Sequence, residues 1–160
     1  MMPPEPIDIL RRTMKNLEFI GTHTGTNGPF EVTQLVNSFL GALVHPWENL
    51  RGDLNDLSIS DAIVKGWPPI QRERPSDQEP TSLGDLIRLV RNGVAHGNIE
   101  FLPGPQGDIR ALSIWNKDGR GRRTWGTIIS TDDMRNLLIC FVTIAEELYV
   151  SQGRSRSRIA

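Results

Sequence analysis

Apolar residues recur every three or four positions along several stretches of this chain, a spacing that places them on one face of an α-helix. The stretches at residues 7–20 and 32–43 precede a region of different texture at residues 99–130. The second of these helices is predicted to stop before Pro46, because proline cannot continue a helix. Such spacing favours a fold built from amphipathic helices that share one apolar core.

The middle of the chain alternates between helix and loop signals. Residues 58–65 predict a short helix, and residues 67–81 contain four prolines among polar side chains, which predicts a long surface loop. Ser82 and Asp85 form a capping pair before the next apolar stripe, and Gly97 is a plausible C-terminal stop. The longest helix of this region is therefore expected between these signals.

Short β-prone runs follow at residues 99–102, 109–115 and 124–130, separated by segments rich in Gly, Pro and Asp. This alternation predicts a small β-hairpin, extended to three strands. The last helix is expected to start near Thr131 or Asp132. The predicted fold class is mainly α: an antiparallel helical bundle with a small β-hairpin insertion before its last helix.

Length and composition agree with one globular domain. The chain has 160 residues, of which 38% are hydrophobic and 23% charged. We expect a single domain over residues 1–152, with the β-insertion at about 99–130 and a basic flexible tail at 153–160.

The sequence carries few signals for other environments. No apolar run approaches the roughly 18 residues of a membrane span, and the first residues lack the pattern of a secretory signal. Cys140 is the single cysteine, and no Cys/His spacing matches a zinc site. We therefore expect a cytoplasmic protein with no membrane association, no metal and no cofactor.

Charge is unevenly distributed along the chain. Residues 1–109 carry 9 basic and 14 acidic side chains, whereas residues 110–160 carry 9 basic and 5 acidic ones. Arg120, Arg122 and Arg123 lie together in one predicted loop. Arginine's planar fork suits phosphate, so these three are candidate RNA contacts, and the alternative is a solvated loop.

The most informative segment is Arg91-Asn92-Gly93-Val94-Ala95-His96, at the end of the helix that follows Ser82. Histidine titrates near neutrality, so it can remove the proton of a ribose 2′-OH or protonate the leaving 5′-oxygen. Arginine can hold the scissile phosphate through charge-assisted hydrogen bonds. Asparagine can orient the histidine or bind a phosphate oxygen. These residue types together could cleave RNA without a metal.

Helix geometry constrains how the three side chains meet. Asn92 and His96 are four positions apart and share a face, whereas Arg91 and His96 differ by about 140° around an ideal helix. Convergence requires a long arginine reaching round, a helix that loosens near Gly93 or Gly97, or a second copy of the motif. A two-fold dimer is attractive because transesterification uses both a general base and a general acid.

Residues 91–96 resemble the R-polar-x3-H signature of the HEPN superfamily. Its members are small helical-bundle proteins, and many are metal-independent ribonucleases of toxin–antitoxin, abortive-infection and CRISPR systems. Residues 28–37 and 91–101 together resemble a family of short, stand-alone, plasmid-encoded HEPN proteins. The resemblance covers most of residues 7–102 and the last helix.

This resemblance implies an obligate homodimer with a composite active site, in which Arg91 and His96 match the catalytic pair and Asn92 the polar position. HEPN toxins partnered by nucleotidyltransferase antitoxins usually carry a tyrosine two residues after the histidine. That place is Asn98 here, which argues against adenylylation of such a tyrosine and against that type of antitoxin. Asn98 itself is a candidate RNA contact.

Structural roles compete with these assignments. Arg91 could form a salt bridge with Asp85 or Glu48, and His96 could simply be compatible with the negative end of the helix dipole.

Other polar and aromatic candidates are also open to two interpretations. Trp115 and Trp125 could stack on RNA bases, or they could pack against the bundle or a partner subunit. His45 is expected in a loop or at a helix end, with a smaller chance of touching substrate.

The leading functional hypothesis is a metal-independent endoribonuclease that cleaves single-stranded RNA as a toxin or antiphage-defence effector. Its expected partners are a second copy of the chain, RNA and an antitoxin or regulatory protein. One alternative is a non-catalytic HEPN module that binds nucleotide or RNA and uses Arg91 as a phosphate anchor. The other is a purely structural role for the motif at a dimer interface.

Overall fold

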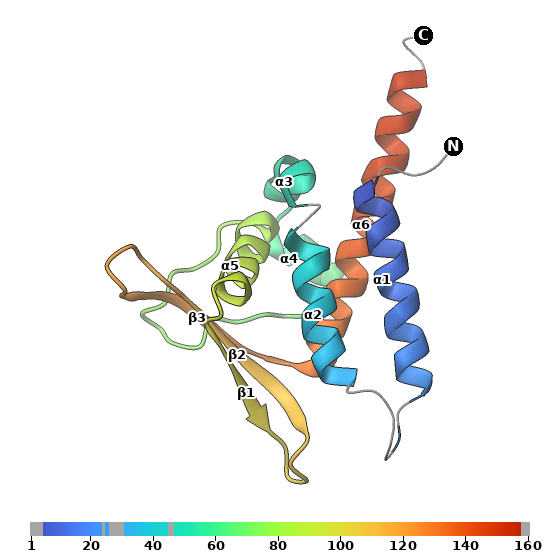
Figure 1. Cartoon of the computed structure of the whole chain (residues 1–160). Coiled ribbons are helices and arrows are strands. Elements are labelled where there is room, and N and C mark those ends of the chain that lie inside the picture. Colours follow the sequence, from blue (N-terminus) through green and yellow to red (C-terminus); the bar gives the residue numbers. More distant parts are fainter. Residues whose placement is uncertain (1–4, 24, 26–30, 45–46, 158–160) are drawn as a thin grey trace.

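The computed structural model describes residues 5–23, 25, 31–44 and 47–157. These residues form six helices and one three-stranded antiparallel sheet (Figure 1). In chain order the elements are α1 (Glu5–Thr22), α2 (Glu31–Val44), α3 (Trp47–Asn55), α4 (Ile59–Val64), α5 (Leu83–Ala95), β1 (Ile99–Pro103), β2 (Ile109–Lys117), β3 (Arg123–Ser130) and α6 (Thr131–Ser157).

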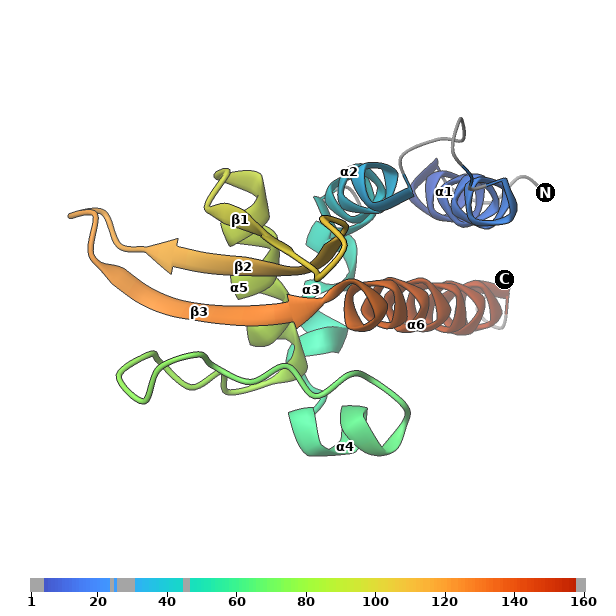
Figure 2. The ribbon, with the colours of Figure 1, turned by 90° about the horizontal axis from the view of Figure 1, so that it is seen from below.

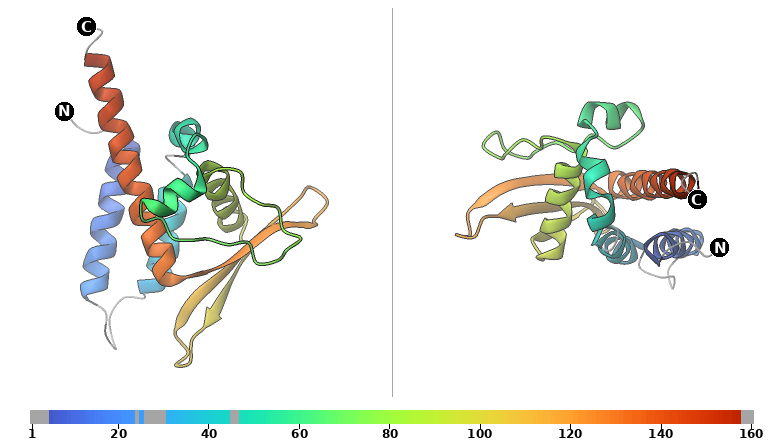
Figure 3. Two further views of the ribbon diagram at one scale, coloured as in Figure 1. Left: turned by 180° about the vertical axis from the view of Figure 1, so that it is seen from behind. Right: turned by 90° about the horizontal axis from the view of Figure 1, so that it is seen from above.

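Three helices, α1, α2 and α6, pack side by side, and α5 joins them through α2 (Figure 3). Each buries the apolar stripe that its sequence predicts, because a helix with one apolar face must cover it. Fully buried examples are Leu10 on α1, Phe39 on α2, Ile87 on α5 and Phe141 on α6. The helical part of the fold class is thus confirmed.

Local signals place the ends of α5. The Ser82 hydroxyl accepts a hydrogen bond from the backbone N–H of Asp85 at 3.1 Å, and the Asp85 carboxylate accepts one from the N–H of Thr81 at 3.1 Å. Such caps satisfy N–H groups that have no partner inside the helix. At the other end Gly97 adopts a φ of 68°, the left-handed conformation that glycine tolerates. The predicted start and stop signals are confirmed.

The sheet has the order β1-β2-β3, and its strands lie where the three β-prone runs predict them. Ile114 on β2 lies between Ile99 on β1 and Thr127 on β3. Leu112, Ile114 and Trp125 are fully buried in the same core as the helices. The expectation of a small insertion added to a complete helical bundle is therefore corrected. The sheet supplies part of the core itself, because one of its faces is apolar and packs under α5.

A close approach joins α5 to β2. A Cβ atom added at Gly93 would lie 2.5 Å from Cγ2 of Ile114 and 3.0 Å from the carbonyl oxygen of Trp115. One turn earlier, the carbonyl of Leu89 accepts a hydrogen bond from the buried Asn116 side chain at 2.5 Å. The helix that carries the candidate motif is thus fixed on the sheet by packing and by a buried polar contact.

The segment at residues 67–81 is irregular, as expected, but it is more than a surface loop. It follows the outer edge of β3, where the N–H of Glu73 donates to the carbonyl of Gly126 at 2.8 Å and the N–H of Gln78 to that of Thr124 at 2.9 Å (Figure 2). An open strand edge presents unpaired backbone groups, and this segment satisfies some of them. Trp67 and Asp77 are buried as a result.

Two further features differ from expectation. Helix α3 was not predicted: only Leu50 and Leu54 are buried in its described part, and Gly52 weakens the helical signal. Helix α6 continues through residues 153–157, where we expected a flexible tail to begin. Arginine is a good helix former, and no proline follows to end the helix.

Within the described part of the chain, no helix is both long enough and apolar enough to cross a membrane.

Candidate functional site

The polar side of α5 forms an exposed stripe that holds all three motif side chains. Asp85, Arg88, Arg91 and Asn92 are partly exposed and His96 is exposed. The opposite side of the helix is buried: Leu83, Gly84, Leu86, Ile87, Leu89, Val90, Gly93 and Val94. On an ideal helix the stripe is about 140° wide, with the arginine and the histidine of the motif at its two edges.

Arg91 lies beside Asn92 and has an unsatisfied donor. Its Nη1 donates to Oδ1 of Asn92 at 3.1 Å, whereas its Nε is buried and has no hydrogen-bond partner. A buried donor without an acceptor is costly. The side chain as a whole is partly exposed, so the rest of the guanidinium can meet an acceptor from outside the chain.

Among the described side chains, Arg91 forms no salt bridge with a carboxylate expected as its structural partner. Asp85 is engaged by Arg88, whose Nε and Nη2 donate to it at 3.1 and 2.6 Å. The side chain of Glu48 lies outside the described ones. Over the part of the chain that the structure describes, no carboxylate therefore neutralises Arg91.

His96 is the C-cap residue of α5. Its N–H donates to the carbonyl of Asn92 at 3.0 Å, and its φ of −89° and ψ of 4° take the chain out of the helix. Helix α5 continues past Gly93 as far as Ala95, so the backbone does not loosen at Gly93. It leaves the helical conformation only at His96 and Gly97. No hydrogen bond joins the imidazole to any described side chain, Arg91 and Asn92 included. Within one chain Arg91 is therefore hydrogen-bonded to Asn92, and no hydrogen bond joins it to His96 among the described residues.

Asn98 ties the end of the motif to the sheet through its backbone. Its N–H donates to the carbonyl of Gly93 at 2.9 Å, and its carbonyl accepts from the N–H of Trp115 at 3.1 Å. The side chain is partly exposed and lies two residues beyond His96 in the chain. This tether holds the exposed imidazole at a defined edge of the sheet.

Comparison with known proteins gives one match. The family model described as HEPN pEK499 p136 matches residues 1–152, nearly the whole chain. The chain belongs to this HEPN family. The match confirms the resemblance to a family of plasmid-encoded HEPN proteins. No curated protein and no solved structure is similar enough to count as a match.

The arginines in the β2–β3 loop of this HEPN protein and at the start of β3 differ in how many of their side-chain donors are engaged by carboxylates. Arg120 is exposed, and only its backbone N–H has a partner, Asp118 at 2.9 Å. Arg122 is also exposed, but its Nε donates to Asp118 at 2.8 Å. The backbone N–H and guanidinium of Arg122, with the N–H of Arg120, hold the pKa of Asp118 below its usual value.

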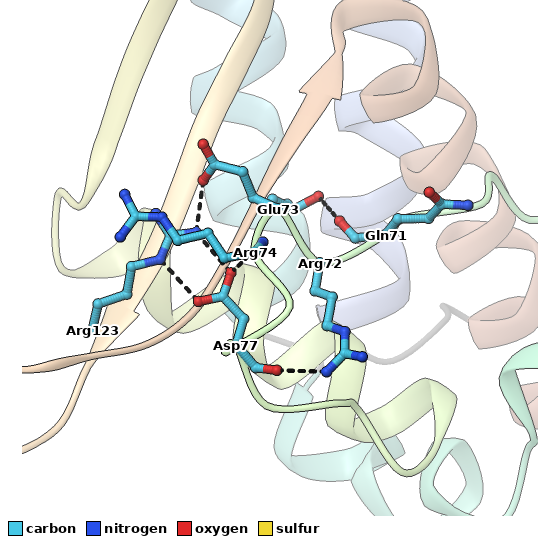
Figure 4. A network of polar contacts seen from close by, with 7 residues as sticks. Gln71, Arg72, Glu73, Arg74, Asp77 and Arg123 are labelled. Carbon is cyan, nitrogen blue, oxygen red and sulfur yellow. Dashed lines mark hydrogen bonds and ion pairs between the residues drawn. The ribbon is translucent and has the colours of Figure 1, made fainter.

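Arg123 is committed to a structural contact (Figure 4). It donates from Nε and Nη2 to Asp77 at 3.0 and 2.8 Å, and from Nη2 to Glu73 at 2.6 Å. Its hydrogen bond to Asp77 lowers the pKa of that carboxyl and raises the pKa of the arginine. The side chain is 18% exposed and its donors are occupied by carboxylates, which leaves it poorly placed to bind RNA as well.

The remaining candidates are also placed by the structure. Trp125 is fully buried in the core, so it packs against the body rather than stacking on a base, whereas Trp115 is half-buried. His45 lies outside the described residues. Among the side chains that are described, no group of three His, Cys, Asp or Glu could hold a metal ion.

Two arginines near the motif were not singled out from the sequence. Arg88 is three residues before Arg91 on the same exposed stripe, so helical periodicity alone could have found it. Arg51 on α3 carries no such signal, because it reaches the stripe only through the packing of α3 on α5. Together they line a pocket beside the motif.

Proposed function

We propose that this HEPN protein is a metal-independent endoribonuclease that cleaves single-stranded RNA at a site completed by a second copy of the chain. One observation carries the proposal. Arg91, with a buried and unsatisfied Nε, is fixed beside Asn92 on the exposed stripe that ends at a free His96. A structural arginine is normally paired with a carboxylate, whereas Arg91 has no such partner among the described residues. A phosphate group would supply an acceptor for the exposed part of its guanidinium.

The reaction is a transesterification. The ribose 2′-oxygen attacks the adjacent phosphorus while the bond from phosphorus to the 5′-oxygen breaks. A general base accepts the 2′-OH proton, and a general acid protonates the leaving 5′-oxygen, so the products carry a 2′,3′-cyclic phosphate and a 5′-hydroxyl. Arg91 neutralises the charge that develops on the phosphate oxygens, and Asn92 orients the guanidinium through their hydrogen bond.

A homodimer supplies what one chain lacks. Each chain offers one motif histidine, and the reaction uses two proton-transfer groups. Arg91 and His96 lie at opposite edges of the exposed stripe of α5. Two such stripes facing each other about a two-fold axis, across a cleft that admits RNA, would set the arginine of one chain near the histidine of the other.

The biological role that fits this chemistry is a toxin or antiphage-defence effector acting on cytoplasmic RNA. Such an activity calls for restraint by an antitoxin or regulatory protein, because uncontrolled RNA cleavage harms the cell that makes it.

The test is cleavage of single-stranded RNA by the purified protein in the presence of EDTA, with His96→Ala as the comparison. We expect the wild type to leave 2′,3′-cyclic phosphate ends and the variant to lose at least about a hundredfold in rate. Thr22→Ala is a matched control, because this exposed hydroxyl lies at the end of α1 and away from the motif. Equal cleavage by wild type and His96→Ala would overturn the assignment, and RNA binding that depends on Arg91 without any cleavage would make the protein a non-catalytic RNA-binding module.

A further inference from the structure

A pocket of about 380 Å³ opens between α3 and α5, one turn of helix before the motif. It is lined by Arg51, Asn55, Thr81, Ser82, Asp85 and Arg88. Most of these groups are hydrogen-bonding ones, and the two arginines come from two different helices.

The two arginines of the pocket differ in whether a carboxylate offsets their charge. Arg88 is held by Asp85, so those two charges largely offset each other and fix the arginine in one position. Arg51 is exposed, and within the described residues its side chain has neither an ion pair nor a hydrogen bond. The net charge of the lining is therefore positive, with one free guanidinium and one that is held in place.

The position of the pocket relates it to the motif. Arg88 and Arg91 are three residues apart on α5, about 4.5 Å along the helix axis at 1.5 Å per residue. Stacked nucleotides advance by about 3.4 Å each, so one or two nucleotides cover this distance. Because Arg88, Arg91 and Asn92 share the exposed stripe, a strand that lies along it meets the pocket without crossing a buried surface.

The shape of the pocket depends on a tight contact between the two helices. A Cβ atom added at Gly84 would lie 2.8 Å from the backbone nitrogen of Asn55, so α3 and α5 touch backbone to backbone here. Four of the six lining residues, Arg51, Asn55, Asp85 and Arg88, are thus carried by these two helices, which is how a binding site keeps its geometry.

We infer that this pocket binds a backbone phosphate of the RNA strand, one or two nucleotides away from the scissile bond, through Arg51 and Arg88. The inference deepens the proposed ribonuclease function and rests on it for the identity of the strand. The chemistry of the pocket suits a phosphate monoanion or diester: a guanidinium offers paired donors, and the Asn55 amide offers another. Its consequence is a preference for substrates long enough to reach from the motif to the pocket.

The experiment measures RNA binding in a background that cannot cleave. His96→Ala and His96→Ala/Arg51→Gln are titrated with a single-stranded dinucleotide and a dodecanucleotide, and fluorescence anisotropy gives each Kd. We expect the dodecanucleotide to bind more tightly than the dinucleotide in the first protein, and most of this gain to disappear in the second. Loss of one arginine–phosphate contact corresponds to about a tenfold weaker Kd for the longer RNA.

Salt dependence supplies a second readout that a change of fold would not produce. Each phosphate contact on a single strand adds about 0.7 to the slope of log affinity against log salt concentration. Arg51→Gln should lower this slope by about that amount, and Arg51→Lys should restore most of it because the charge is kept.

The matched control is Arg110→Gln, which removes the same charge from the β1–β2 hairpin, at the end of the molecule opposite α3 (Figure 1). It should leave the Kd of the dodecanucleotide unchanged. Equal weakening by Arg51→Gln and Arg110→Gln would mean that general charge, rather than the pocket, attracts RNA, and would overturn the inference.

Failure of this inference can be told apart from failure of the proposed function. If the wild type cleaves RNA but Arg51→Gln changes neither Kd nor slope, the pocket is not a phosphate site and the nuclease assignment stands. If no RNA is cleaved but the dodecanucleotide still binds through Arg51, the pocket assignment stands for a non-catalytic RNA-binding protein. Equally tight binding of the dinucleotide and the dodecanucleotide, with both weakened by Arg51→Gln, would overturn the strand assignment in favour of a short nucleotide ligand.

Discussion

The guanidinium of Arg123 donates to two carboxylates that belong to the segment at residues 67–81, and one of them, Asp77, is only 4% exposed. The same carboxylate accepts a hydrogen bond from the N–H of Arg74 at 3.0 Å, and the carbonyl of Asp77 accepts one from Arg72 at 2.8 Å. These contacts hold the irregular segment against the edge of β3. The arginine therefore fixes the fold and its charge is offset where it lies.

Replacing Asp77 with asparagine should destabilise the protein by about 1–3 kcal/mol at neutral pH, because Arg123 loses its buried charged partner. Urea unfolding monitored by tryptophan fluorescence measures the loss. As a control, Asp118→Asn should cost less, since the carboxylate that it removes pairs with an exposed arginine.

The effect should also depend on pH in a defined direction. The hydrogen bond from Arg123 lowers the pKa of Asp77 below 3.8, so the carboxylate's contribution is complete above the usual carboxyl pKa. It is lost only as the pH falls through the lower, folded-state value. The difference between wild type and Asp77→Asn should thus be constant from pH 7 to about pH 5 and shrink below about pH 4. A difference that grows on acidification would contradict the contact.

The arginines of this chain have contrasting surroundings, and the sequence alone does not show which of them are exposed and which are held in ion pairs. Arg122 and Arg123 are neighbours, yet one is exposed and the other is held by Asp77, which lies 46 positions earlier. Only the tertiary fold brings that carboxylate to the loop. The motif residues were easier to find, because Arg91, Asn92 and His96 are close in sequence and helical periodicity places them on one side of α5.

At the scale of elements, the position of α5 depends on one glycine. Gly93→Ala should destabilise the protein by about 1–3 kcal/mol, because the new methyl group would overlap Ile114 and the Trp115 carbonyl on β2. This loss would appear even though alanine is the better helix former by about 1 kcal/mol. Thermal unfolding measures it.

Gly52 on α3 provides the matched comparison. It also lies within a helix, but a Cβ atom there would meet nothing within 4 Å. Gly52→Ala should therefore stabilise the protein by up to about 1 kcal/mol, through helix propensity alone. If both substitutions were stabilising, α5 would not be packed against β2 as closely as the structure has it.

Elements with a strong local pattern were predictable, and those defined by distant contacts were not. The stripes of α1, α2, α5 and α6 and the three β-prone runs determine their elements because period and turn residues are local properties. Helix α3 has a short apolar face, and its place depends on α5. The pairing of residues 67–81 with β3 depends on an open strand edge, which a linear pattern does not reveal.

At the scale of the whole molecule, the net charge of −1 conceals how the surface is organised. Many acidic side chains pair with arginines inside the chain, as Asp77, Asp85 and Asp118 do. Arg91 and Arg51 have no such partner among the described residues and flank the same exposed stripe of α5. A small total charge is therefore compatible with a local surface that attracts phosphate.

The proposed composite site makes a prediction about mixed dimers. A fixed amount of wild type is incubated with increasing amounts of His96→Ala, long enough for subunits to exchange, and cleavage is measured with RNA in large excess over protein. If each reaction uses a histidine from both chains, mixed dimers are inactive or nearly so, and the activity of the wild type falls as the variant is added. The excess of RNA prevents the variant from acting merely by binding substrate.

An unrelated protein at the same concentration controls for dilution and crowding and should leave the rate unchanged. A second control is His96→Ala added immediately before measurement, when subunits have not yet exchanged, which should also have little effect. Activity that stays constant under exchange would mean that one chain, with its single motif histidine, is sufficient. The geometry of α5 argues against that outcome, because within one chain Arg91 and His96 lie at opposite edges of the stripe and the hydrogen bond of Arg91 goes to Asn92 instead. A second chain is the simplest source of the missing group.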